Sequence, residues 1–186
     1  MKIDKIKVGY LRTNCYLIEN NNEALIIDPG DEYDKIKEFI KDKNLIGILL
    51  THNHFDHTGC INNLINDYNI PLYDNNSLNE GINHISTFNF KVIKTYGHTM
   101  DSISFYFEED KTMFTGDFLF YDTIGRCDLE ESNSNEMRKS IDKIKQYNND
   151  ITIYPGHGKE TNLGREKKKI FILTNIMIEY KADCGG

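Results

Sequence analysis

Apolar residues recur along this chain with two different periods, and each period predicts one kind of secondary structure. Short runs rich in β-branched and aromatic residues predict strands, because such side chains fit a pleated, partly buried surface. Asparagine, glycine and acidic residues separate these runs and predict the turns between them. The predicted strands are 2–8, 15–19, 24–27, 46–50, 71–73, 88–95, 103–107, 111–115 and 151–154.

Elsewhere the apolar residues lie three and four positions apart, which is the spacing of one face of an amphipathic helix. This spacing predicts helices at 34–43, 58–68, 134–147 and 163–180. Residues 75–86 are polar and irregular, so we expect a loop there that can hold a short helix. Strands and helices alternate in both halves of the chain, which favours two β-layers with the helices outside them.

Length and composition predict a single soluble domain that spans residues 1–186. The chain is 39% hydrophobic and 27% charged, which is ordinary for a globular protein. Its formal net charge of −7 lacks the basic excess of nucleic-acid-binding proteins, so we expect no nucleic-acid partner. No stretch approaches the ~20 apolar residues that cross a bilayer, and the N-terminus lacks a signal-peptide core, so we expect a cytoplasmic protein with no membrane partner.

A histidine-rich stretch, 51–57, directly follows the predicted strand 46–50. Four of its seven side chains can bind a metal ion: His52, His54, Asp56 and His57. The first three are two positions apart, so in an extended segment they lie on one side while His57 points elsewhere. One such stretch can therefore serve two adjacent metal ions.

Three more candidate ligands follow later predicted strands, and a glycine stands directly before each: His98, Asp117 and His157. Taken alone, His98 would be an ordinary hydrogen-bonded histidine and Asp117 part of a turn. With 51–57, however, they place five of the six histidines at strand ends, where sheet proteins assemble sites. Imidazole and carboxylate together are what divalent metals bind, so the joint pattern predicts a metal site. We expect no such role for the sixth histidine, His84.

The combination resembles the metallo-β-lactamase superfamily, whose mark is the HxHxDH box that stands here at 52–57. Segments 13–16 and 28–30 are similar to the family's early strands, and later Gly-His-Thr, Thr-Gly-Asp and Pro-Gly-His-Gly segments follow in its order. Segments 114–129 and 163–167 resemble the hydroxyacylglutathione hydrolase (glyoxalase II) group. The resemblance implies an α/β fold, namely a four-layer αββα sandwich with the site at one rim.

The resemblance also implies a ligand set and a reaction. The implied ligands are His52, His54 and His98 for one divalent metal ion and Asp56, His57 and His157 for the other, with Asp117 bridging them. The metals would be zinc, with iron or manganese as alternatives. The implied reaction is hydrolysis of a small thioester by water that the two metals activate, with Asp56 and Asp117 as catalytic residues. A thiol with a pKa of about 8.5 leaves as thiolate without a strong acid.

One rival reaction uses the same fold. Persulfide dioxygenases resemble this group and use a single iron at positions matching His52, His98 and Asp117, which predicts an oxidoreductase. Full-length glyoxalase II proteins also carry a further C-terminal helical region, whereas the residues after Gly158 leave room for about one long helix. The substrate is expected to be a small molecule, and the sequence leaves the oligomeric state open.

Four single residues outside the ligand set have alternative roles. Asp28 either orients a histidine of the site or ends a strand in an Asp-Pro-Gly turn. Arg126 either binds a substrate carboxylate or phosphate or forms a structural salt bridge. Cys15 and Cys60 are expected to pack in the interior, since the chain's four cysteines include no CxxC pair and suit reduced thiols.

Overall fold

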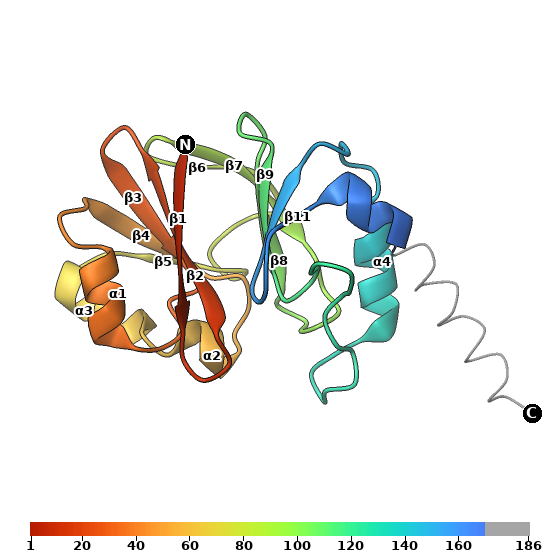
Figure 1. The fold of residues 1–186 in the computed structure, drawn as a ribbon, viewed down its shortest axis with the longest axis horizontal. Helices are drawn as coiled ribbons and strands as arrows, with labels where there is room; N and C mark the ends of the chain where they lie inside the picture. The colour runs from red at the N-terminus through yellow and green to blue at the C-terminus, as the bar shows by residue number, and fades with distance from the viewer. Residues whose placement is uncertain (170–186) are drawn as a thin grey trace, which may run out of the picture.

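The computed structural model describes residues 1–169, and two β-sheets dominate it (Figure 1). The first sheet has the strand order β1-β2-β3-β4-β5. Its antiparallel part comes first in the chain, and two parallel strands follow, each reached through a helix. The elements are β1 (Lys2–Val8), β2 (Thr13–Asn20), β3 (Glu23–Ile27), α1 (Tyr33–Phe39), β4 (Leu45–Leu49), α2 (Phe55–Thr58), α3 (Ile61–Tyr68) and β5 (Leu72–Tyr73).

The second sheet has the strand order β11-β10-β9-β8-β7-β6. It is antiparallel except where β10 pairs in parallel with β9, and the helix α4 makes that crossover. The elements are β6 (Gly81–Ile85), β7 (Phe88–Lys94), β8 (Ile103–Phe107), β9 (Thr112–Gly116), α4 (Ser134–Ile144), β10 (Thr152–Pro155) and β11 (Thr161–Asn162).

Three separate hydrophobic clusters show that the elements form four layers. In β2, Cys15 and Leu17 face α1 and α3, whereas Tyr16 and Ile18 face the second sheet. This alternation follows from the two-residue period of a strand, and β2 is buried on both faces. The third cluster lies between the second sheet and α4. Figure 1 shows the result, with α1 and α3 outside one sheet and α4 outside the other, which confirms the predicted αββα sandwich.

Most predicted elements are confirmed, with three differences. The predicted loop 75–86 is wrong, because it contains the edge strand β6, which buries only Ile85 and so carries a weak apolar signal. The predicted helix 58–68 is confirmed from Ile61 onward as α3, whereas the helix α2 before it and the short strand β11 were not predicted. Residues 163–169 are helical as predicted, and the rest of that predicted helix, 170–180, lies outside the described residues.

Within residues 1–169, no helix combines the length and the apolar character that crossing a bilayer requires.

Candidate metal centre

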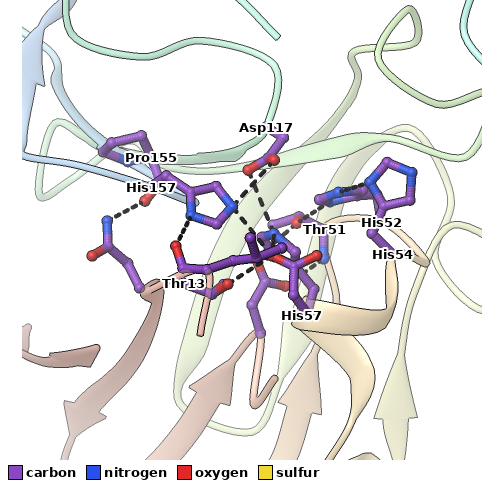
Figure 2. A network of polar contacts seen from close by, with 12 residues as sticks. Thr13, Thr51, His52, His54, His57, Asp117, Pro155 and His157 are labelled. Carbon is purple, nitrogen blue, oxygen red and sulfur yellow. Dashed lines mark hydrogen bonds and ion pairs between the residues drawn. The ribbon is translucent and has the colours of Figure 1, made fainter. Parts of the chain in front are cut away.

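Seven side chains that the sequence singled out converge between the two sheets, from four separate places in the chain (Figure 2). His52 and His54 follow β4, Asp56 and His57 belong to α2, His98 lies between β7 and β8, Asp117 follows β9, and His157 follows β10. Figure 2 shows Asp117 between His157 on one side and His52 and His54 on the other. His84 stands apart on β6, where it hydrogen-bonds Asn89.

The local conformation of the histidine-rich stretch differs from the expected extended segment. His54 is extended, with φ −81° and ψ 148°, and α2 begins at the next residue. Asp56 and His57 therefore project from a helical turn. His57 does not point elsewhere, because its Nε2 lies 3.5 Å from Asp117 Oδ1 and its ring centroid 4.2 Å from that of His52.

Each of the five clustered histidines has one ring nitrogen facing the cluster and the other held by a partner outside it. The held nitrogens are His52 Nδ1 by Thr51 Oγ1 (3.0 Å), His54 Nε2 by Glu131 Oε1 (2.8 Å), His57 Nδ1 by Asp28 Oδ2 (3.0 Å), His98 Nδ1 by the Arg126 carbonyl (3.0 Å) and His157 Nδ1 by the Leu11 carbonyl (3.2 Å). Carboxylate and carbonyl oxygens only accept, so these nitrogens donate. Thr51 also accepts, because its own proton goes to Asp28.

The first group of nitrogens has the geometry of a metal site. His52 Nε2 and His98 Nε2 each lie 3.0 Å from His54 Nδ1. Burial holds the pKa of His52 well below its ordinary value and also lowers the pKa of His98, so both rings are neutral at pH 7. The hydrogen bonds to outside partners place the ring protons on the outward nitrogens. The lone pairs of His52 Nε2 and His98 Nε2 therefore each face that of His54 Nδ1 across 3.0 Å. Such an arrangement is favourable only with a cation between the rings, and imidazole nitrogens are ligands for divalent metals.

The second group combines two imidazoles with carboxylates. Burial opposes protonation of His57, but Asp28 and Asp117 outweigh it and raise the pKa of His57 to about 10. Burial likewise opposes protonation of His157, but Asp117 and Asp56 raise its pKa to about 9. In the protein without metal, positive charge on these two rings therefore balances the carboxylates. A divalent cation can take over that role when the protons leave.

Two buried atoms support a cation between the groups. Within residues 1–169, His57 Nε2 and Asp117 Oδ1 are buried and make no hydrogen bond, although they lie 3.5 Å apart. Buried polar atoms normally have partners, and a metal ion would supply one to both. Asp117 also lies 3.4 Å from His157 Nε2 and 3.7 Å from His98 Nε2 through its other oxygen. Asp117 therefore contacts both groups, as a bridging ligand must.

Asp28 is a buried carboxylate that holds both Thr51 and His57 in place. Its carboxylate accepts two hydrogen bonds from Thr51, at 2.9 and 2.8 Å, and one from His57 at 3.0 Å. The side chain is 2% exposed and its φ is 52°, a left-handed conformation that aspartate tolerates better than most residues. Of the two roles expected for Asp28, the structure shows the contact with a histidine of the site. Asp28 also directly follows the end of β3, at Ile27.

Glycine is required at two places by close approach. A Cβ at Gly116, where φ is 49°, would lie 2.3 Å from Thr51 Oγ1. A Cβ at Gly156 would lie 2.2 Å from Asp117 Oδ1 and 2.8 Å from His57 Cε1. These glycines let β9 and β10 bring the later ligands against the earlier ones.

Sequence reasoning missed several residues that hold the cluster. Thr13 donates a hydrogen bond to Asp56 Oδ2 at 2.7 Å, and Glu131 holds His54. Neither has a signal in the sequence, because each contact depends on tertiary approach. Arg126 forms a two-pronged salt bridge with Asp128 at 2.7 and 2.9 Å, which is the structural alternative, while its carbonyl holds His98.

Exposed apolar side chains occur in the segments around the cluster. Five large hydrophobic side chains are exposed among residues 1–169: Tyr10, Leu11, Phe55, Ile82 and Met100. All but Ile82 belong to segments that carry or contact a candidate ligand. Tyr10 is 95% exposed beside Leu11, whose carbonyl holds His157, and Met100 lines a cavity of about 490 Å³ together with His54 and Glu131.

Several known proteins resemble this chain in sequence and in fold. The family model of the metallo-beta-lactamase superfamily matches residues 8–75 and 69–157. The hydroxyacylglutathione hydrolase GloC of Haemophilus influenzae is 34% identical over 90% of this chain and 96% of that protein. The crystal structure of the BLEG-1 B3 metallo-beta-lactamase has a TM-score of 0.85 at 30% identity, covering 90% of this chain and 97% of that one. TTHA1623, solved in a di-iron-bound form, has a TM-score of 0.82 at 28% identity, covering 89% and 98%.

Proposed function

Because the chain belongs to the metallo-beta-lactamase superfamily, we propose that its seven clustered side chains bind two divalent metal ions and that it hydrolyses a small thioester. One observation carries the proposal. In the first group, the outer nitrogen of each ring is hydrogen-bonded to a partner outside the cluster, so the unprotonated inner nitrogens of all three rings converge on one point. His52, His54 and His98 would hold one ion. Asp56, His57 and His157 would hold the other, with Asp117 between them.

The metals, when bound, lower the pKa of water to ~7 and polarise a carbonyl oxygen. The chain's own residues supply orientation. Asp56 is fixed by the hydroxyl of Thr13 at 2.7 Å and lies 3.2 Å from His157, so its carboxylate is placed to accept a hydrogen bond from the attacking water and orient it. A thiolate leaving group, with a pKa of about 8.5, needs no strong general acid.

A thioester is favoured over other substrates by similarity to GloC, which bears the name of a hydroxyacylglutathione hydrolase over almost the same length. The match covers 96% of GloC, so nearly all of that protein aligns with this chain. Zinc is the proposed metal, and iron is the alternative because TTHA1623 was solved with two iron ions. The cytoplasmic location, the small-molecule partner and the single domain over 1–186 stay predictions.

The exposed side chains around the cluster support substrates with apolar groups. Tyr10 directly precedes Leu11, whose carbonyl holds His157, and Met100 lines the same cavity as His54. Covering either one with an acyl chain contributes about 1 kcal/mol, equivalent to about fivefold in kcat/KM. We therefore propose that the preferred thioesters carry an apolar acyl group.

The test combines metal analysis with kinetics on one preparation. Protein purified without added metal is analysed for zinc, iron and manganese, then assayed with thioesters of increasing acyl length, a lactone and a phosphodiester. We expect two metal ions per chain, thioester hydrolysis, and loss of both in Asp117→Asn. Tyr10→Ser and Met100→Ser should lower kcat/KM for long acyl chains about fivefold, while Ile82→Ser, equally apolar but remote, leaves it unchanged.

The dioxygenase alternative predicts a different result in the same experiment. It requires one iron per chain, oxygen uptake with a persulfide, and no thioester hydrolysis. That outcome would overturn the hydrolase proposal. Unchanged kinetics in all three serine variants, with hydrolysis intact, would overturn only the apolar acyl preference.

A further inference from the structure

Glu131, which accepts a hydrogen bond from His54, differs from the partners of the other four histidines. The partners of His52 and His57 are buried side chains just past the C-terminal ends of β4 and β3. The partners of His98 and His157 are backbone carbonyls. His54 alone is held by the side chain of an exposed loop, 77 positions later in the chain. Among residues 1–169, no other side chain hydrogen-bonds its Nε2.

We propose that Glu131 is a positioning residue for the first metal ion. By accepting the Nε2 proton of His54 at 2.8 Å, it keeps the Nδ1 lone pair directed at His52 and His98. A carboxylate that accepts the outer N–H of a ligating histidine also makes the ring a stronger ligand. The inference rests on the proposed metal-binding function and adds a residue that is not itself a ligand.

The loop 129–133 fixes the position of Glu131 independently of His54. Asn133 accepts hydrogen bonds from the first amides of α4, at 3.0 and 3.2 Å, and its own amide donates to the Gly97 carbonyl at 2.8 Å. Directly before Asn133, Ser132 donates to the Leu129 carbonyl through both its amide and its hydroxyl, which closes a turn around Glu131. Glu131 therefore lies in a closed turn that Asn133 ties to Gly97, the residue directly before His98. The carboxylate is held ready for His54 even without a metal.

Folding stability does not account for the contact. The side chain of Glu131 is 50% exposed, and exposed ion pairs of this kind contribute little to folding because water screens them. A metal ligand depends differently on the same contact, since ring orientation and tautomer decide whether a lone pair reaches the ion. The contact therefore affects metal binding far more than folding.

The effect should be confined to one of the two ions. Glu131 contacts His54, which belongs to the first group, and within residues 1–169 it makes no hydrogen bond or ion pair with Asp56, His57 or His157. Partners of this kind typically change metal affinity by about 10–100-fold. Glu131→Ala should weaken the first ion by that factor and leave the second within about twofold.

The test titrates metal-free protein with Co²⁺ and with Zn²⁺ in competition with a chromogenic chelator. It compares the parent protein with Glu131→Ala, Glu131→Gln and the control Glu130→Ala, which removes an exposed neighbouring carboxylate. We expect two binding steps in the parent and control, one of them weakened about 10–100-fold in Glu131→Ala. Glu131→Gln should recover part of the loss, because its amide oxygen still accepts from His54. The Co²⁺ absorption spectrum of the weakened step should change, whereas the melting temperature without metal should match the control.

Different outcomes separate this inference from the proposed function. A parent protein that binds fewer than two ions overturns the proposed function and the inference with it. A parent that binds two ions while Glu131→Ala keeps both affinities overturns the inference alone. Equal weakening of both ions, or a lowered melting temperature without metal, also overturns it, because the role would then be structural.

Discussion

Replacing Asp28 by asparagine should destabilise the metal-free protein strongly at neutral pH and weakly at alkaline pH. Asp28 is fully buried and accepts from Thr51 and from His57, whose pKa is raised to about 10 against the opposing effect of burial. Asparagine keeps the size of the side chain and tolerates the φ of 52°. The substitution therefore removes the charge and one acceptor without adding backbone strain.

The magnitude follows from the raised pKa. Moving a histidine from its ordinary value of 6.5 to about 10 corresponds to about 5 kcal/mol of stabilisation of the protonated ring. Asp28 and Asp117 share that effect, with Asp28 the larger contributor, so Asp28→Asn should cost about 3 kcal/mol at pH 7. Because the folded pKa is raised, this stability is complete below pH 6.5 and disappears as pH rises through about 10. Near pH 11 the cost should fall to about 1 kcal/mol, the value of a neutral hydrogen bond.

The assay is urea denaturation in excess chelator at pH 7 and pH 11, followed by circular dichroism. Asp31→Asn, an exposed aspartate in the same turn, serves as the control at each pH and corrects for the general effect of alkali. A loss below about 1 kcal/mol at pH 7, or an equal loss at both pH values, would refute the reasoning. Either result would mean that the folded, metal-free protein does not contain an ion pair between protonated His57 and Asp28.

Three further predictions concern other parts of the chain. Gly156→Ala should abolish binding of at least one metal ion, measured by metal analysis of folded protein, because its Cβ would lie 2.2 Å from Asp117 Oδ1; a variant that still binds two ions would contradict the geometry. Glu166→Ala should lower the free energy of unfolding by about 3 kcal/mol, measured with urea, because the buried carboxylate pairs with Arg165 and accepts from Thr161. Cys60 should resist iodoacetamide at pH 8 until the protein unfolds, as mass spectrometry would show, because burial raises the pKa of its thiol to about 11; rapid labelling of native protein would refute its packing role.

The fold was largely predictable where each element carries its own signal. β2 and β7 have apolar runs that are buried over most of their length, and α4 has both an apolar stripe and an asparagine cap. The edge strand β6 was missed because Gly81, Asn83 and His84 interrupt its apolar pattern and only Ile85 is buried, so its strand conformation depends on pairing with β7. The helical turn α2 was missed because extended spacing and a single turn are not distinguishable in four residues.

By itself, the sequence determined the chemical content of the site, since the candidate ligands and the glycines before them are local features of strand ends. The tertiary structure alone decided how those ligands are aimed. For four of the five histidines, the proton is fixed by an oxygen from a distant segment, such as Glu131 for His54 across 77 positions or Leu11 for His157 across 146. Such contacts leave no periodicity in the chain, because they depend on how two sheets pack face to face and not on which residues follow one another.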